Sequence, residues 1–194
     1  MMARLVSDLD VREVVLSYID GYIDGDLDRL QGLGITRLDI VTRTITDLDG
    51  LYEGFDEVWA LYLMTPLVRT VDFGRLAQLE HFRGEWYQIK GSVGAAAGLR
   101  RLWLLHYTEP DLVALTGNQA LKRVGTEDYP RISSFRGLDG LPRLEALGVY
   151  VTRRLASGES WRVGVRRGSV SRVWVLAGRS ILWIGWLNIH RWRN

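Results

Sequence analysis

The stretch Leu138-Asp139-Gly140-Leu141-Pro142-Arg143-Leu144-Glu145-Ala146-Leu147-Gly148-Val149 decides the fold of this chain. It ends in an aliphatic triplet with the spacing L-x-x-L-x-L, and versions of this triplet occur eight times along the sequence. The eight triplets begin at Val11, Ile35, Val58, Leu79, Leu99, Leu121, Leu144 and Val170, so neighbouring triplets start 20 to 26 residues apart. A period of this length, sustained along a chain, is typical of proteins built from stacked repeats.

The quoted stretch resembles the signature G-L-x-x-L-x-x-L-x-L of the leucine-rich repeat family, and residues 48–51 and 98–104 carry the same signature. The resemblance covers residues 11–155. It implies an α/β leucine-rich-repeat solenoid, in which each triplet is a strand of one parallel concave sheet and the connections form the convex side. Members of the family mostly bind proteins and share no universal catalytic residue, so the resemblance implies a binding module without a cofactor.

The chain departs from the family at the ninth position of each repeat, where Asn or Cys usually bonds the backbone inside the turn. The residues at this position are Ile19, Arg43, Leu67 (counted in place of Pro66 before it), Tyr87, Tyr107, Tyr129 and Thr152. Because no asparagine ladder is present, we expect irregular turns after the strands and a poorly ordered convex side.

The repeat pattern predicts a single domain over residues 1–194. We expect an N-terminal cap over residues 1–10, about seven repeats over 11–155 and a C-terminal antiparallel β-meander cap over 156–194. The cap is predicted from strand-like runs at residues 161–166, 170–176 and 181–187, which short Gly-containing links separate. In this division the eighth triplet, at Val170, falls within the predicted cap.

Composition excludes several classes of protein. The chain has no cysteine, which excludes disulfides and thiol chemistry and fits a cytoplasmic location. Residues 1–10 lack the apolar run of a secretory signal, and the apolar stretch 173–189 is interrupted by Arg179 and Asn188, so we expect no membrane span. The strong preference for Arg over Lys suggests a bacterial coding bias. No metal site is expected, since the acidic cluster at 20–28 lacks the distal glutamate of a calcium loop.

The net charge of +2 is unevenly distributed along the chain. Residues 1–80 hold 7 basic and 15 acidic side chains, a balance of −8, whereas residues 81–194 hold 18 basic and 8 acidic ones, a balance of +10. Chain order is spatial order in a repeat protein, so we expect an acidic-to-basic axis that orients an approaching partner.

The register predicts which side chains form the binding surface. Positions three, five and seven of each repeat point outward, and residues at one position in adjacent repeats lie side by side. The predicted partner-binding patch on the concave face consists of Tyr62, His81, Arg83, Glu85, Trp86, Arg101, Trp103, Arg123 and Glu127. Exposed aromatic and Arg side chains with charged neighbours are the composition of an interface hot spot, so we expect another protein as the partner, in an immunity or regulatory role.

Two of these residues have a structural alternative. Trp103 stands between two inward leucines and is expected to face out; the alternative is that its ring lies flat on the sheet under a neighbouring loop. Trp86 is at the eighth position, where the chain turns, and the alternative is that it turns into the core.

Two further functions compete with protein binding. His106 and Asp128 share the eighth position of adjacent repeats and are the weak candidates for a catalytic acid–base pair, which makes an enzyme the first alternative. The second alternative is nucleic-acid binding by the C-terminal region, in which nine arginines interleave with tryptophans. The arginines there are Arg153, Arg154, Arg162, Arg166, Arg167, Arg172, Arg179, Arg191 and Arg193.

Overall fold

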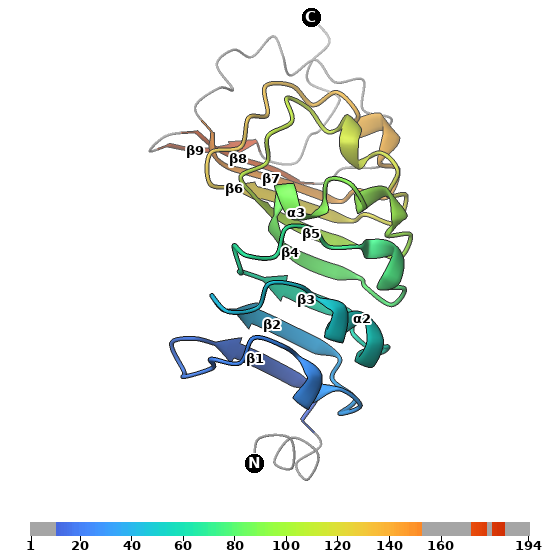
Figure 1. Cartoon of the computed structure of the whole chain (residues 1–194). Helices are drawn as coiled ribbons and strands as arrows, with labels where there is room; N and C mark the ends of the chain where they lie inside the picture. Colours follow the sequence, from blue (N-terminus) through green and yellow to red (C-terminus); the bar gives the residue numbers. More distant parts are fainter. Residues whose placement is uncertain (1–10, 153–171, 178–179, 185–194) are drawn as a thin grey trace, which may run out of the picture. The chain divides into compact units, whose positions relative to one another are not determined.

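The computed structural model describes residues 11–152, 172–177 and 180–184 (Figure 1). The chain divides into two compact units, Met1–Gly98 (unit 1) and Leu99–Asn194 (unit 2). The predicted N-terminal cap and the predicted strand at 161–166 lie outside the described residues. Each unit is built from parallel strands with few, short helices, an arrangement compatible with an α/β fold.

Unit 1 contains four parallel strands, which lie side by side in chain order (Figure 1). They are β1 (Glu13–Ser17), β2 (Arg37–Val41), β3 (Ala60–Leu63) and β4 (His81–Glu85). Glu13 pairs with Arg37, Arg37 with Ala60, and Ala60 with His81. The predicted alignment of equivalent positions in neighbouring repeats is therefore confirmed within this unit.

Unit 2 continues the same pattern and then changes direction once. The strands β5 (Arg101–Leu105), β6 (Arg123–Glu127), β7 (Ala146–Thr152) and β8 (Arg172–Ala177) run parallel, and β9 (Ser180–Ile184) runs antiparallel to β8. Arg101 pairs with Arg123, Arg123 with Ala146, and Ala146 with Arg172.

The eighth triplet corrects the predicted cap. Val173 and Val175 pair with Leu147 and Val149 of β7, so this triplet forms one more parallel strand, β8, inside the predicted antiparallel meander. The predicted hairpin after it is confirmed, because Ala177 pairs with Ser180 across the two-residue link. The aliphatic triplet at residues 170–175 has the spacing of the earlier triplets, and this pattern favoured one more parallel strand over the shorter spacing of the later runs.

Alternation of apolar and polar residues explains why these segments form strands. The fourth and sixth residues of each triplet point inward, and Leu38, Ile40, Leu104 and Val149 have no exposed surface. Burying each such side chain stabilises the fold by about 1.5–3 kcal/mol. The outward third position is exposed or half-buried in five of the six described strands from β1 to β6, the exception being Ala60, which is buried.

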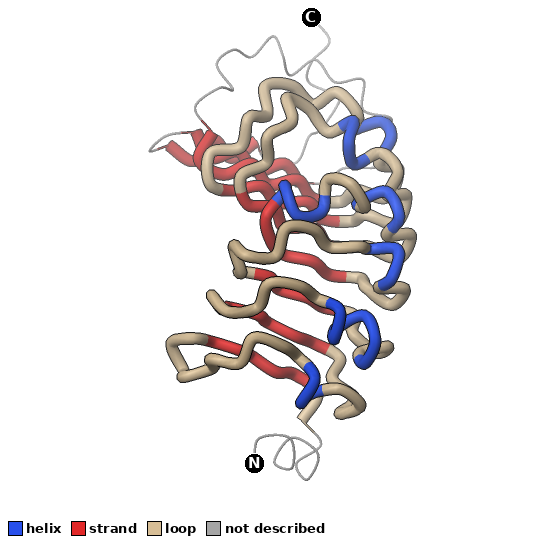
Figure 2. Tube along the Cα trace, in the orientation of Figure 1, coloured by secondary structure: helices blue, strands red, loops and turns tan. Residues whose placement is uncertain are grey.

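The connections carry short helical turns, which lie on one side of the strands in each unit (Figure 2). The α-helical turns are α2 (Asp49–Gly54) and α3 (Trp86–Ile89), and the 3-10 turns are η1 (Asp28–Leu30), η2 (Phe73–Arg75), η3 (Val93–Ala95), η4 (Val113–Leu115) and η5 (Leu138–Gly140). All four prolines lie outside the strands, as predicted, since proline lacks the N–H that a ladder requires.

In unit 1 a buried glutamine forms hydrogen bonds between two neighbouring connections. Gln88 is buried in α3, and its Nε2 donates to the carbonyls of Thr65 and Val68, each at 2.9 Å. These carbonyls belong to the connection of the preceding strand. A buried carbonyl left without a donor costs about 1–3 kcal/mol, so Gln88 ties one connection to the next.

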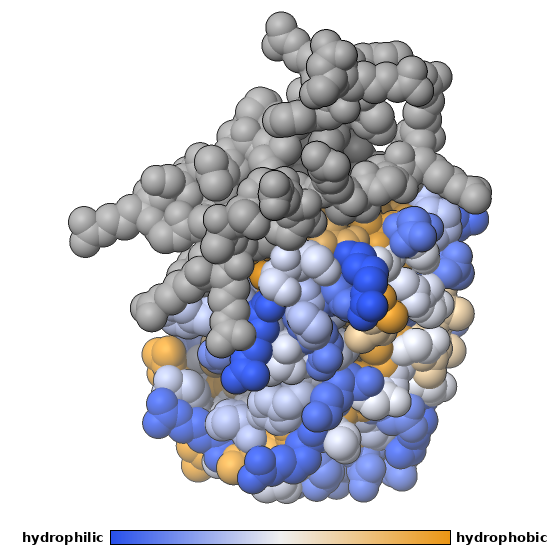
Figure 3. All heavy atoms as spheres, turned by 90° about the horizontal axis from the view of Figure 1, so that it is seen from above, coloured by the Kyte–Doolittle hydropathy of each residue, from blue (hydrophilic) through white to orange (hydrophobic). Residues whose placement is uncertain are grey.

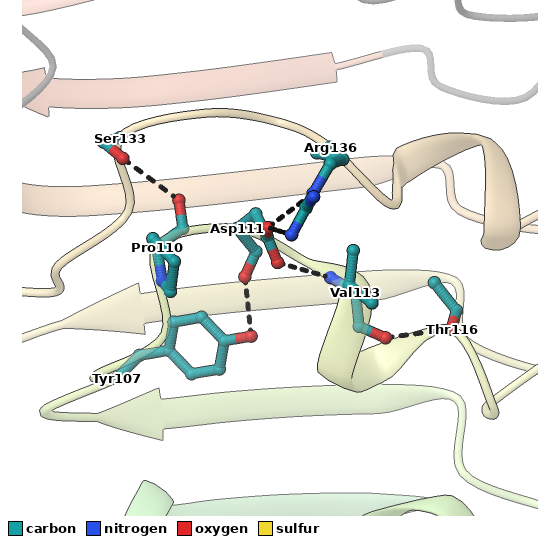
Figure 4. A network of polar contacts seen from close by, with 7 residues as sticks. All are labelled: Tyr107, Pro110, Asp111, Val113, Thr116, Ser133 and Arg136. Carbon is teal, nitrogen blue, oxygen red and sulfur yellow. Dashed lines mark hydrogen bonds and ion pairs between the residues drawn. The ribbon is translucent and has the colours of Figure 1, made fainter.

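In unit 2 an acidic residue also links one connection to the next (Figure 4). The Asp111 carboxylate accepts from the Val113 backbone N–H at 3.0 Å, at the start of η4, and from Arg136 at 2.7–2.8 Å. Its backbone carbonyl accepts from the hydroxyl of Tyr107, which is fully buried. Burial raises the pKa of the Tyr107 hydroxyl, so it stays a donor across the physiological pH range. The predicted disorder of the convex side is therefore wrong for these connections, because irregular turns are held by specific polar contacts.

Candidate binding face of the sheet

The candidate site is the outward face of the strands, which is described separately for each unit. The predicted patch splits into Tyr62, His81, Arg83, Glu85 and Trp86 in unit 1 and Arg101, Trp103, Arg123 and Glu127 in unit 2. Figure 3 shows the molecule from above rather than facing the strands, and the described surface left uncovered in that view is mostly hydrophilic.

In unit 1 the aromatic residues of the patch are engaged by neighbours. The Arg83 guanidinium lies 4.9 Å from the centre of the Tyr62 ring, a cation–π arrangement between β4 and β3. The Tyr62 hydroxyl contacts the sulfur of Met64, the residue that follows β3. The half-buried His81 ring meets Trp59 edge to face at 4.9 Å. Tyr62, His81 and Arg83 therefore lie on the outward face, as predicted.

The arginine of β2 is neutralised within the same face. Arg37 donates to both carboxylate oxygens of Asp39 at 3.2 Å and lies 3.8 Å from Glu13 on β1. Its charge is therefore balanced by carboxylates of its own strand and the neighbouring one.

The prediction that Trp86 belongs to the exposed patch is wrong. Trp86 is the first residue of α3 and is only 2% exposed, so its ring packs in the core. The chain leaves the strand after Glu85 and turns into a helix, which directs the next side chain inward. Glu85 itself caps this helix: its side chain accepts from the backbone N–H of Gln88, while the Gln88 side chain accepts from the backbone of Glu85. Glu85 thus serves the fold.

In unit 2 two aromatic rings form a platform on the outward face. Trp103 of β5 and Tyr150 of β7 stack, with ring centres 5.3 Å apart and planes 26° from parallel. The strand between them has glycine at the same register position, Gly125, which pairs with both Trp103 and Gly148. A Cβ atom on Gly125 would stand 2.3 Å from the Trp103 ring, and one on Gly148 would stand 2.6 Å from the Tyr150 ring. The rings therefore lie flat over backbone that only glycine leaves bare.

The position of Trp103 agrees with the prediction in one respect and with its alternative in another. It points to the outward side of the sheet, as predicted, and its ring lies flat on the sheet, as the alternative proposed. Its partner Tyr150 was not among the predicted site residues. The consecutive glycines at the fifth position of two neighbouring repeats were the signal in the sequence that the ring from β5 has room to reach β7.

Two arginines flank this platform. Arg101 and Arg123 are in register on adjacent strands, two residues before Trp103 and Gly125, and both are exposed. Within the described part of the chain, neither guanidinium group forms an ion pair or a hydrogen bond. Two like charges directly opposite each other on neighbouring strands repel, by about 0.2–1 kcal/mol.

The other side of the platform carries a carboxylate. Glu127 is the last residue of β6 and is half-buried, as Tyr150 is. Burial and the nearby charge of Glu127 raise the pKa of the Tyr150 hydroxyl. The platform therefore lies between a positive row, Arg101 and Arg123, and a negative group, Glu127.

The candidate catalytic residues lie at the exits of β5 and β6. His106 and Asp128 are both exposed and both have left-handed backbone, with φ of 49° and 58°, followed by Tyr129 at 61°. The His106 backbone N–H donates to the Glu127 carbonyl at 3.1 Å, which ties the two exits together. Because water reaches both side chains, they lack the solvent-shielded setting that acid–base catalysis uses.

The acidic cluster of unit 1 is engaged in local contacts. Asp24 pairs with Arg29 at 3.3 Å, and Asp26 accepts from the Asp28 backbone N–H at 3.2 Å. Across the described ranges, no group of three or more His, Asp or Glu residues is arranged to hold a metal ion.

Unit 1 also has a shallow hollow that the sequence did not indicate. Its lining consists of Asp56, Glu57, Trp59, Gln78 and Glu80. Glu57 accepts a hydrogen bond from Arg12 at 3.2 Å. The negative charge of the hollow is therefore partly balanced by the residue just before β1. Trp59 links this hollow to His81 of the outward face.

Three broader observations complete the site. The C-terminal region predicted for nucleic-acid binding lies mostly outside the described residues, and only Arg172 of its arginines has a register position, beside Ala146. In the segments that the structure describes, no helix has the length and apolar character to cross a membrane.

Comparison of the chain with protein-family models, with curated proteins and with solved structures gives no match.

Proposed function

We propose that this chain is a leucine-rich-repeat solenoid with a C-terminal antiparallel cap, which binds another protein on its concave sheet and is not an enzyme. The periodic triplets and the in-register parallel strands of each unit support the repeat architecture. The hairpin of β8 and β9 supports the cap. The proposal includes a cytoplasmic location, which cell fractionation tests.

The observation that carries the binding function is the stacked pair Trp103 and Tyr150, lying over Gly125 and Gly148 and flanked by Arg101 and Arg123. Aromatic and Arg side chains on a rigid, preformed surface are the side chains that dominate protein interfaces. Their positions are set by strands rather than loops, so a partner meets them with little loss of side-chain freedom.

Site-specific photo-crosslinking tests this proposal. A benzophenone amino acid is placed at Ala146, beside Arg123 on the outward face, or, as the control, at Arg143 in the connection before β7, and the full chain is irradiated in the cells that produce it. We expect a discrete protein adduct from position 146 that disappears when Trp103→Ala is added, and no such adduct from position 143. Adducts that ignore Trp103→Ala, or that form only from position 143, would refute binding through this face.

A further inference from the structure

We propose that the outward face of unit 2 takes an extended protein segment with an acidic side chain two residues before a flat, aromatic one. The acidic group lies against Arg101 and Arg123, and the flat group lies on the Trp103–Tyr150 platform. The inference rests on the proposed function and adds to it the chemistry of the partner.

The arginine row provides the first half of the argument. Arg101 and Arg123 are opposite each other on strands about 4.8 Å apart. Neither has a counter-ion among the described residues, so the pair repels itself. A carboxylate between them removes that repulsion and gains charge-assisted hydrogen bonds, which Arg forms in bidentate geometry. The next residue of the row is the small Ala146, so no bulky side chain bounds the row on that side.

The platform provides the second half. Trp103 follows Arg101 by two residues on the same strand, so the row and the platform are about 7 Å apart on one face. Side chains i and i+2 of an extended peptide have the same spacing and also point to one face. The stacked rings offer a flat apolar surface held in place by the glycines beneath it, which suits an aromatic or other planar side chain.

Glu127 distinguishes a protein segment from a nucleic acid strand. It lies two residues beyond Gly125 on β6, about 13 Å along the strand from Arg123, next to Tyr150. A phosphodiester chain that used the arginine row and the platform would bring its next charge toward this carboxylate, which repels it. A peptide has one acidic group at the row and is free to place a neutral or basic residue opposite Glu127.

A peptide-display selection on the full chain tests the inference. Random heptapeptides are selected against the wild-type protein and against the double variant Arg101→Glu/Arg123→Glu, with Arg143→Glu as the matched control for an exposed arginine outside the strands. We expect wild-type binders enriched in Asp or Glu two positions from an aromatic residue. The double variant should bind those peptides at least tenfold more weakly and should select Lys or Arg at that position instead, whereas the control should select as the wild type does.

The possible outcomes test the acidic–aromatic preference separately from the proposed protein-binding function. Peptides that need Trp103 but show no acidic preference, or that bind the double variant equally well, overturn the inference and leave the binding face standing. The absence of any peptide sensitive to Trp103→Ala overturns both.

A labelled single-stranded oligothymidylate tests the nucleic-acid alternative. Binding that is lost in the double variant, falls steeply with salt and displaces the selected peptides would assign the face to nucleic acid and refute the inference. Binding that is absent, or unchanged in the double variant, supports it. The substituted residues Arg101, Arg123 and Arg143 are exposed, and Trp103 lies on the outward face. Unchanged far-UV circular dichroism confirms that the variants fold.

Discussion

Units 1 and 2 have the same strand register but treat charge on their outward faces differently. In unit 1, Arg37 is held by Asp39 and Glu13, and Arg83 lies over Tyr62, so its cations have partners in the same face. In unit 2, Arg101 and Arg123 face each other with no ion pair in the described ranges, beside an aromatic platform laid over glycines. A surface whose charges are already satisfied gains little from a partner, whereas unit 2 still has charge to neutralise. The comparison therefore supports the proposal that the binding face is in unit 2.

The two units also stabilise their connections with different chemistry. Unit 1 uses a neutral side chain, Gln88, whereas unit 2 uses an ionised one, Asp111, together with Arg136. Gln88 donates to carbonyls of the preceding connection, whereas Asp111 accepts from an amide of its own connection and from Arg136 of the next one. Stability measurements that change one unit at a time test this division.

The largest loss of stability is expected for Gly137→Ala in unit 2. Gly137 has a φ of 92°, and an added Cβ would stand 2.6 Å from the Val113 nitrogen, which is backbone and cannot move aside easily. We expect a loss of about 3 kcal/mol or more in urea unfolding. Gly91→Ala in unit 1 is the control, because its Cβ would meet nothing within 4 Å. Equal effects of the two substitutions would contradict the packing described for η5 and η4.

A smaller loss is expected for Asp111→Ala. The substitution removes the acceptor of the Val113 N–H at the start of η4 and the ion pair with Arg136, while Arg136 itself remains in water, so we expect a loss of about 2 kcal/mol. The control is Asp49→Ala in unit 1, whose 3.8 Å contact with Arg75 is exposed on both sides and contributes about 0–1 kcal/mol. Thermal unfolding of both variants measures the difference, and a loss for Asp49→Ala as large as that for Asp111→Ala would contradict the role given to the buried Asp111 carboxylate.

Gly125→Ala should affect the platform more than the stability. The added methyl group would overlap the Trp103 ring, so the ring must leave its place over β6 at a cost of about 1 kcal/mol. We expect the near-UV circular dichroism of the Trp103–Tyr150 stack to change and binding of the selected peptides to fall about fivefold, since a tenfold change corresponds to about 1.4 kcal/mol. Gly94→Ala, with open space at its Cβ, should change neither signal. Unchanged peptide binding in Gly125→Ala would separate the platform from the binding function.

The smallest effect concerns Tyr22 of unit 1 at alkaline pH. Burial, with Asp24 and Asp26 nearby, raises the pKa of Tyr22 to about 12. The unfolded chain ionises its tyrosines near pH 10, so Tyr22 contributes stability that is fully present below pH 10 and is lost as the pH rises toward 12. We expect Tyr22→Phe to weaken this part of the decline and to remove a group titrating near pH 12 in ultraviolet absorbance. A variant with the same alkaline profile as the wild type would contradict the assignment.

Much of the fold was predictable because the aliphatic triplets repeat. Leu38 and Ile40 must be buried together, and that requirement alone sets which neighbours face outward and which strand pairs with which. The same pattern extends to β8, where the shorter spacing of the following runs led to a wrong prediction of an antiparallel start to the cap. The hairpin link between β8 and β9 was correctly placed, since its glycine-containing turn is a local signal.

The candidate site was predictable as rows of residues but not as contacts. Tyr62, Arg83, Arg101 and Trp103 occupy the outward positions that the register assigns, whereas Trp86 is buried and Glu85 caps a helix. The sequence places a side chain in a row; whether the chain turns immediately after it depends on how the next connection packs.

The sequence by itself determined the period, the register and the charge of each row, because these follow from the alternation of side chains along a strand. Only the tertiary structure decided that Trp103 lies flat across Gly125 to meet Tyr150, and that Trp86 turns inward. Both outcomes depend on the space left by residues of other strands and connections. A large ring takes whichever position removes most of its surface from water, and the residues that define that space come from other repeats of the chain.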